Sequence, residues 1–329
     1  MLQSLSRRRI LTAGLAAGLA AALLPAAARA ADTVREIRLD YAYYNPVSLV
    51  LKEKGILEEE LKKDGISVRW VLSLGSNKAL EFLNAGSLDF GSTAGAAALI
   101  AKINGNPIKS VYVYSKPEWT ALVTGPNTGI AKVADLKGKR VAVTRGTDPH
   151  IFLVRTLAEH GLTDKDVKLV LLQHQDGRLA LEKGDVDAWA GLDPMMAQAE
   201  LDQGAKLFFR NPDANTWGVL NVREEFARAN PELVGRVLRA YEKARAIALK
   251  DAGALKAAIA AAAKLSEPVA ARQLERTDLT HSAIGEPQAK TILEAGLALQ
   301  QAGVLGADVD VKGAVAALID PSFAKALTQ

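Results

Sequence analysis

The chain has 329 residues, with 41 Lys and Arg against 37 Asp and Glu, 49% hydrophobic residues and no cysteine. This apolar content excludes extensive disorder, and a length of roughly 300 folded residues at about 150 per domain predicts two domains. The lack of cysteine excludes disulfides, thiolate metal sites and a cysteine nucleophile.

The positive net charge belongs to the N-terminal segment. Four of the arginines, and no acidic residue, lie in the first 31 residues, so the rest of the chain carries 37 basic and 37 acidic side chains. A protein that binds nucleic acid through its phosphates needs an excess of Lys and Arg on its folded surface. The charge balance therefore argues against a nucleic-acid partner.

Residues 1–30 have the pattern of an export signal. The pair Arg7-Arg8 precedes an uncharged stretch over 10–28, and Ala28-Arg29-Ala30 offers a small-x-small cleavage site. The arginine pair favours the twin-arginine route, with Sec export as the alternative. A membrane anchor is disfavoured because the stretch is Ala-rich, weakly apolar and interrupted by glycine and proline. We expect cleavage near Ala30 and a soluble protein in the periplasm.

Short β-rich apolar runs then alternate with longer helical patterns, which is typical of strand–helix–strand units with mostly parallel sheets. In the first part of the chain we expect strands at 37–42, 68–74, 88–91 and 108–114, with helices at 47–64, 76–85 and 95–104. A connecting strand at 119–124 leads to turn-forming residues at 125–129. A first crossing between domains is predicted there.

A second α/β unit is expected over 130–210, with strands at 140–144, 168–172, 188–190 and 205–209 and helices at 149–160, 177–183 and 194–203. After a second crossing at 211–215, a strand at 217–222 is followed by helices at 224–249, 252–265, 267–277, 287–301 and 311–318. The predicted class is therefore α/β with two lobes, lobe one over 31–124 and 216–329 and lobe two over 125–215. Clefts between such hinged domains bind small ligands.

Four segments carry a family resemblance: GSLDFGST at 86–93, VADLKGKRVAV at 133–143, RGTDPH at 145–150 and GDVDAWAGLDP at 184–194. Their order and spacing resemble those of the substrate-binding proteins of ABC importers for aliphatic sulfonates, taurine and nitrate, with the sulfonate group closest. The resemblance covers residues 37–210 best and implies the type II periplasmic-binding-protein fold, with two hinge strands. One departure is Leu192 before Asp193-Pro194, where sulfonate binders often have an aromatic residue.

Three glycine-containing turns, at 75–77, 91–95 and 146–148, are each expected to open a helix. Helix N-termini bind anions through unpaired N–H groups, and glycine lets the backbone approach closely. Hydrogen bonds to a charged group contribute about 1.5–3 kcal/mol each, against about 0.3–1 kcal/mol for an exposed helix dipole. Neutral donors therefore suffice for a permanently ionised sulfonate. The alternative is that Ser76, Ser92, Thr147 and Asp148 are only helix caps.

Aromatic side chains at strand ends and crossings are candidates for the wall around the organic part of a ligand, although each could equally be core. His150 is a candidate anion donor in the first turn of a helix, and Asp193 could hold an ammonium group or cap a helix. His160, His174 and His281 are spaced too irregularly for a metal pair, and no metal or cofactor is expected. The candidate ligand-binding residues are Tyr43, Asn45, Ser76, Asn77, Ser92, Thr93, Trp119, Thr147, Asp148, His150, Trp189, Asp193 and Trp217.

The expected function is a monomeric periplasmic receptor that closes around an aliphatic sulfonate and delivers it to an ABC permease. Taurine, nitrate or a heterocyclic vitamin precursor are alternative ligands, and taurine would call for a carboxylate such as Asp148 or Asp193. Motifs of common enzyme classes (GxSxG, HExxH, GxxxxGK[ST], GxGxxG) do not occur. We expect no catalysis, although related folds include pyrimidine-precursor enzymes.

Overall fold

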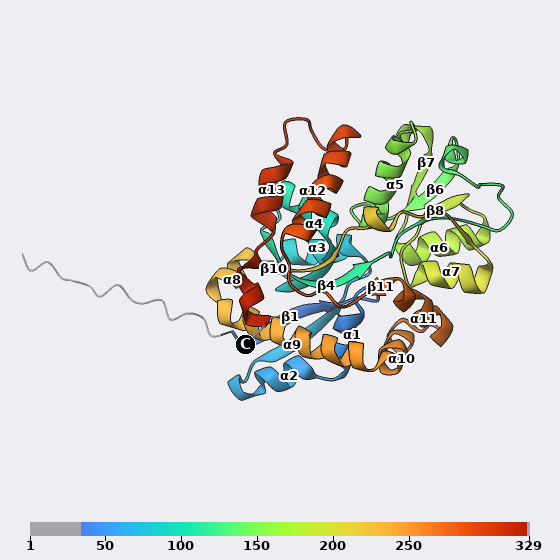
Figure 1. Ribbon diagram of the computed structural model, residues 1–329. Coiled ribbons are helices and arrows are strands. Elements are labelled where there is room, and N and C mark those ends of the chain that lie inside the picture. Colours follow the sequence, from blue (N-terminus) through green and yellow to red (C-terminus); the bar gives the residue numbers. More distant parts are fainter. Residues whose placement is uncertain (1–33, 328–329) are drawn as a thin grey trace, which may run out of the picture. The chain divides into compact units, whose positions relative to one another are not determined.

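The structure, a computed structural model, describes residues 34–327, and the predicted export signal lies outside them (Figure 1). Two sheets organise these residues, with strand orders β11-β4-β10-β3-β1-β2 and β7-β6-β8-β5-β9. The first contains β1 (Glu36–Tyr41), β2 (Ser67–Leu72), β3 (Phe90–Ala94), β4 (Ile108–Pro117), β10 (Gly218–Arg223) and β11 (Thr277–Asp278). The second contains β5 (Leu122–Thr124), β6 (Arg140–Val143), β7 (Lys168–Leu171), β8 (Ala188–Ala190) and β9 (Lys206–Phe209).

Both sheets contain parallel and antiparallel strands. The antiparallel ones include β5 and β10, the first strands after the chain passes from one sheet to the other. Strand β1 is parallel to β2 and β3, and β6 is parallel to β7 and β8. Strand β5, the first after the chain enters the second sheet, is antiparallel to both neighbours, as is β10, the first after it returns. The α/β class with two lobes is thus confirmed.

Helices cover both sheets, and separate hydrophobic clusters form their cores (Figure 1). Around the second sheet lie α5 (Asp148–Glu159), α6 (His174–Lys183) and α7 (Met195–Gln203). The remaining helices are α1 (Pro46–Glu53), α2 (Ile56–Leu61), α3 (Ser76–Asn84), α4 (Gly95–Ile103), α8 (Glu224–Ala229), α9 (Pro231–Lys250), α10 (Ala252–Ala263), α11 (Glu267–Glu275), α12 (Glu286–Gln301) and α13 (Val311–Leu318).

Two predicted helices are each divided in two, and one predicted strand is displaced. The helix expected at 47–64 is interrupted at Gly55, whose φ of 60° lies in the left-handed region that ends helices. The helix expected at 224–249 divides before Pro231, which has no N–H to continue the ladder. Strand β3 runs to Ala94, beyond the 88–91 predicted, so Ser92 and Thr93 lie inside a strand. The prediction that they open a helix is wrong.

The chain crosses between the sheets at two places. The first crossing runs from the end of β4 at Pro117 to Leu122, because β5 already pairs with β8 and β9 of the second sheet. The second runs from Phe209 to Gly218, between β9 and β10. The crossings expected at 125–129 and 211–215 lie close to these segments, and the exact limits of the lobes stay a prediction.

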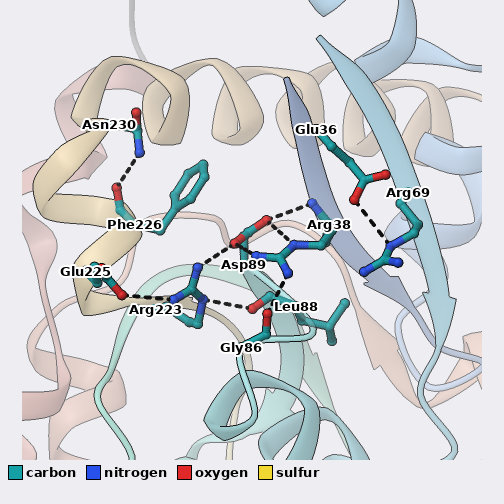
Figure 2. Close-up of polar contacts among 10 residues, drawn as sticks. All are labelled: Glu36, Arg38, Arg69, Gly86, Leu88, Asp89, Arg223, Glu225, Phe226 and Asn230. Carbon is teal, nitrogen blue, oxygen red and sulfur yellow. Dashed lines mark hydrogen bonds and ion pairs between the residues drawn. The ribbon is translucent and has the colours of Figure 1, made fainter. Parts of the chain in front are cut away.

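A buried carboxylate ties three neighbouring strands of the first sheet together (Figure 2). Asp89, just before β3, is 1% exposed and accepts hydrogen bonds from Arg38 on β1 and Arg223 at the end of β10, each at 2.8 Å from Oδ1. Its Oδ2 accepts from the backbone N–H of Arg38 at 2.9 Å and from Nε at 3.0 Å. Both arginines also donate to carbonyl groups of the loop before β3. The cluster therefore fixes one end of β1, β3 and β10.

We predict that Asp89→Ala lowers the free energy of unfolding by about 3 kcal/mol, because it leaves two partly buried guanidinium groups without their shared acceptor. Urea unfolding followed by circular dichroism measures this. Glu53→Ala is the control, since Glu53 pairs with Lys54 on the surface and its removal should change the free energy by about 0.5 kcal/mol or less. Similar small losses in both variants would contradict a structural role for the cluster.

Candidate ligand-binding site

Two of the predicted glycine turns meet across the gap between the lobes. A Cβ added at Gly146, in the turn before α5, would lie 3.7 Å from Asn77 Cβ on α3. One added at Gly75, which precedes α3, would lie 3.0 Å from His174 Nε2 at the start of α6. Gly146 has a φ of 77°, a conformation that favours glycine. The N-termini of α3, α5 and α6 thus converge from both lobes.

The third predicted turn instead belongs to a buried polar network in the first lobe. Ser92 donates through both N and Oγ to Asp40 at 2.9 Å, and Asn45 Nδ2 donates to Ser92 Oγ at 2.8 Å. Thr93 Oγ1 accepts from Asn221 Nδ2 at 2.7 Å. Burial raises the pKa of Asp40 to about 6, against the effect of the Ser92 hydrogen bonds. Asn45, Ser92 and Thr93 are therefore buried and bonded to groups of the first lobe.

Asp148 links α5 to both crossing segments. Its carboxylate accepts from Trp119 Nε1 at 2.8 Å, from Thr216 N at 3.0 Å and from Thr216 Oγ1 at 2.6 Å. Thr216 Oγ1 in turn accepts from Ala96 N in the first turn of α4 at 3.1 Å. Burial raises the pKa of Asp148 to about 6, although the hydrogen bonds from Thr216 and Trp119 lower it. Trp119 and Asp148, both candidate ligand contacts, thus hydrogen-bond each other.

The hydroxyl groups of Thr147 and Ser76 also have internal partners. Thr147 Oγ1 donates its one proton to Thr144 O at 2.6 Å, and Ser76 Oγ accepts from Ala94 N at 3.0 Å. The first N–H groups of a helix have no partner within that helix. Thr147 therefore has no hydroxyl proton left for an anion. The donors that α3 and α5 can offer are backbone N–H groups and the hydroxyl of Ser76, which only accepts in the bond to Ala94 N.

A cleft of about 550 Å³ lies beside these helix ends and is large enough for a small organic molecule. Its first-lobe side is formed by Tyr43, Leu74 and the segment 263–265, and its second-lobe side by the starts of α6 and α7. Tyr43 is half-buried and packs against hydrophobic residues of the second lobe. The charged residues in the lining are Asp176 and Lys264, both exposed. The described lining thus carries no net charge. Of the aromatic candidates, Tyr43 belongs to this lining.

The other two candidate tryptophans, Trp189 and Trp217, pack against neighbouring side chains. Trp189 is 1% exposed in the core of the second lobe, where a Cβ at Gly177 would lie 2.8 Å from its Nε1. Trp217 packs edge-to-face against His281, with ring centroids 5.1 Å apart, and Lys116 lies 5.5 Å from the centre of its ring. Neither residue lines the cleft described above.

His150 and Asp193 are also absent from the cleft lining. His150 lines a different cavity with Arg145, and burial together with Arg145 lowers the pKa of its imidazole. Asp193 Oδ1 accepts from Ala197 N at 2.9 Å, while its Oδ2 lies 3.8 Å from Nη1 of Arg276. Burial raises the pKa of Asp193 to about 7. Asp193 therefore caps α7 and pairs with a residue just after α11.

His174 is not among the residues that the sequence pattern indicates for ligand binding, where it enters only as a possible metal ligand. The ring is 1% exposed, burial lowers its pKa to about 3, and its Nε2 has no hydrogen-bond partner among the described residues. Its position in the chain was the available signal, since His174 follows β7 and opens a helix as the glycine turns do. This turn has no glycine, so the glycine pattern did not mark it. Thr216 and Arg276, which bridge the lobes, were missed as well.

Residues 51–253, more than half of the chain, match the family described as NMT1/THI5 like. The chain belongs to this family. This NMT1/THI5-like protein is 30% identical over 251 residues to the putative aliphatic sulfonates-binding protein of Escherichia coli strain K12, covering 76% of this chain and 78% of the relative. The predicted resemblance to sulfonate-binding proteins is confirmed.

Solved structures agree with this assignment. The alkanesulfonate-binding protein SsuA from Xanthomonas axonopodis pv. citri bound to MOPS superposes on this NMT1/THI5-like protein with a TM-score of 0.78 at 25% identity, over 85% of this chain and 97% of that one. The periplasmic aliphatic sulphonate binding protein SsuA from Escherichia coli gives 0.72 at 27% identity, over 84% and 91%. The fold is thus that of periplasmic binding proteins. In residues 34–327, no helix has the length and apolar character needed to span a bilayer.

The raised pKa of Asp148 predicts a pH-dependent stability. The pKa is about 6 in the folded protein against an ordinary value of 3.8. Between pH 3.8 and pH 6, the native state therefore holds a proton that the unfolded chain has lost. The free energy of unfolding should therefore fall as pH rises through that window. Relative to Asp148→Asn, the wild type should lose about 2–3 kcal/mol between pH 3.5 and pH 7. Urea unfolding of both proteins at each pH measures this, and a difference that does not change with pH would contradict it.

Proposed function

We propose that this protein is the substrate-binding receptor of an ABC importer and that it binds aliphatic sulfonates between its two lobes. The observation that carries the proposal is the convergence of Gly75 and Asn77 of one lobe with Gly146 and His174 of the other. The names of the relatives support the same ligand class. Because the helix ends come from both lobes, one small anion between them would contact both.

The chemistry of the helix ends suits a sulfonate. A sulfonate stays ionised at any ordinary pH, so the protein does not have to supply a proton. Backbone N–H groups at helix N-termini are suitable donors for such an anion, and each hydrogen bond to a charged group contributes about 1.5–3 kcal/mol. The cleft lining adds one acidic and one basic side chain, Asp176 and Lys264. The affinity would thus come from directed hydrogen bonds rather than from net charge.

Binding would favour the closed arrangement of the lobes. A ligand shifts a conformational equilibrium only by its difference in affinity for the two states. A sulfonate held by α3 on one side and by α5 and α6 on the other meets this condition. The segments between β4 and β5 and between β9 and β10 would then act as hinges, with a complete set of contacts only in the closed state.

We further infer that the protein works in the periplasm after removal of its signal, that it delivers its ligand to a membrane permease, and that it has no catalytic role. Taurine as the preferred ligand called for Asp148 or Asp193, and both carboxylates bind groups of the protein itself. Asp176 at the cleft is the remaining acid on that side. Nitrate and heterocyclic vitamin precursors remain alternative ligands.

Calorimetric titration tests the ligand class. Methanesulfonate, hexanesulfonate and 2-aminoethanesulfonate are titrated into the purified protein in a buffer without sulfonates, beside nitrate and sulfate. At least one sulfonate should give saturable heat with one site and raise the melting temperature, and at 100 times its Kd the ligand should add about 2.7 kcal/mol to the free energy of unfolding. Binding of nitrate or sulfate alone, or no heat from any sulfonate, would contradict the proposal.

A further inference from the structure

The imidazole of His174 is the most buried polar side chain at the cleft. It is 1% exposed, it lines the cleft, and it opens α6 in the second lobe. Its Nε2 has no hydrogen-bond partner among residues 34–327 and points to Gly75 of the first lobe, where an added Cβ would lie 3.0 Å away. A buried polar atom without a partner is costly, so its presence at a cleft indicates a ligand or water contact.

The proton on the ring can be placed from its neighbour. Thr144 Oγ1 lies 2.7 Å from Leu172 O and 3.2 Å from His174 Nδ1. A hydroxyl has one proton, and a carbonyl oxygen can only accept, so Thr144 donates to Leu172 and accepts from the ring. Nδ1 of His174 therefore carries the proton. Because burial keeps this imidazole neutral at pH 7, Nε2 is a lone-pair acceptor.

Two further acceptors lie at the same place. Asn77 Oδ1, on the first-lobe side, is 2.7 Å from the position that a Cβ on Gly75 would take. Gln173 Oε1, which precedes His174 and also belongs to the lining residues, is on the second-lobe side. Both oxygens are buried without a hydrogen-bond partner in the described part of the chain. Three buried acceptor atoms without a partner thus lie at or beside the cleft. A lone pair on any of them cannot bind a sulfonate oxygen, which leaves the NH2 groups of Asn77 and Gln173 as the donors of these side chains.

We propose that His174 Nε2, Asn77 Oδ1 and Gln173 Oε1 form a specificity subsite for a hydrogen-bond donor on the ligand. The preferred ligand is then a sulfonate whose carbon chain carries a hydroxyl or an ammonium group, with its sulfonate oxygens at the backbone N–H groups of the helix ends. This inference rests on the proposed function. It adds a set of residues that would select such a ligand, since a plain alkanesulfonate leaves all three acceptors unsatisfied.

Three ligands of the same size and shape test this requirement in the wild-type protein. Propane-1-sulfonate, 2-hydroxyethanesulfonate and 2-aminoethanesulfonate differ only in a terminal methyl, hydroxyl or ammonium group. At least one donor-bearing ligand should bind about tenfold more tightly than propane-1-sulfonate, the factor expected when buried acceptors are satisfied. Equal affinity for all three would overturn the subsite and leave the proposed function intact. Failure of every sulfonate to bind would overturn both.

Variants assign the preference to these residues. In His174→Phe and in Asn77→Ala, the affinity for the better donor-bearing ligand should exceed the affinity for propane-1-sulfonate by about threefold or less, whatever loss the two affinities share. Gln175→Ala is the matched control, because Gln175 is exposed, lies on the same helix turn and lines the same cleft. It should keep the wild-type ratio. If His174→Phe does not fold, Asn77→Ala and the wild-type titrations test the subsite. An unchanged affinity ratio between the donor-bearing ligand and propane-1-sulfonate in Asn77→Ala would overturn the inference.

The same titrations distinguish the two donors. If the ligand's donor is an ammonium group, exposed Asp176 at the cleft supplies the opposite charge, and Asp176→Asn should weaken 2-aminoethanesulfonate by about twofold to fivefold. The same change should leave 2-hydroxyethanesulfonate unaffected. Selective weakening of 2-aminoethanesulfonate would show that the subsite takes an ammonium group. Equal weakening of 2-aminoethanesulfonate and propane-1-sulfonate would show instead that Asp176 acts on the sulfonate or on the fold.

Discussion

The carboxylate of Asp148 is the group on which the position of the cleft depends. It is 2% exposed in the first turn of α5, and it accepts hydrogen bonds from both segments where the chain crosses between the sheets, through Trp119 and Thr216. Burial of a charge is costly unless it is hydrogen-bonded. The N-terminus of α5 is therefore held beside the first lobe, where Thr216 also contacts α4. This link sets Gly146 opposite Asn77.

The buried polar residues divide into two groups by whether they have hydrogen-bond partners within the protein. One group forms hydrogen bonds among its own members and fixes strands of the first sheet; it consists of Asp40, Asn45, Ser92, Thr93 and Asn221. His174, Asn77 and Gln173 have buried acceptors without a partner in the described residues. Residue type alone does not separate these groups. Asparagine occurs in both groups, and only the positions of its neighbours decide which one applies.

Much of the architecture was predictable, because alternation of β-rich runs and helical patterns is a local property of the sequence. The errors occur where one residue changes the local geometry, as at Gly55 and Pro231, or where a long-range partner does. Ser92 reads as a turn residue, yet the carboxylate of Asp40, distant in sequence, holds its N–H within a strand. Such a contact leaves no signal in the neighbouring residues.

The site was less predictable than the fold. The glycine turns at Gly75 and Gly146 could be identified because glycine before a helix is a local pattern, and they do face each other. Trp189 and Trp217 could not be separated from cleft aromatics, since a strand-end position is shared by core and ligand-contacting residues. His174 was missed because its role follows from burial and from the proton of Thr144, neither of which can be inferred from spacing.

A crystal structure of the protein with a bound sulfonate tests the central claim most directly, namely that one anion is held by helix ends from both lobes. The sulfonate oxygens should lie about 2.7–3.2 Å from backbone N–H groups of α3 on one side and of α5 or α6 on the other. A sulfonate that contacts only one lobe, or that occupies the separate cavity beside His150, would contradict it.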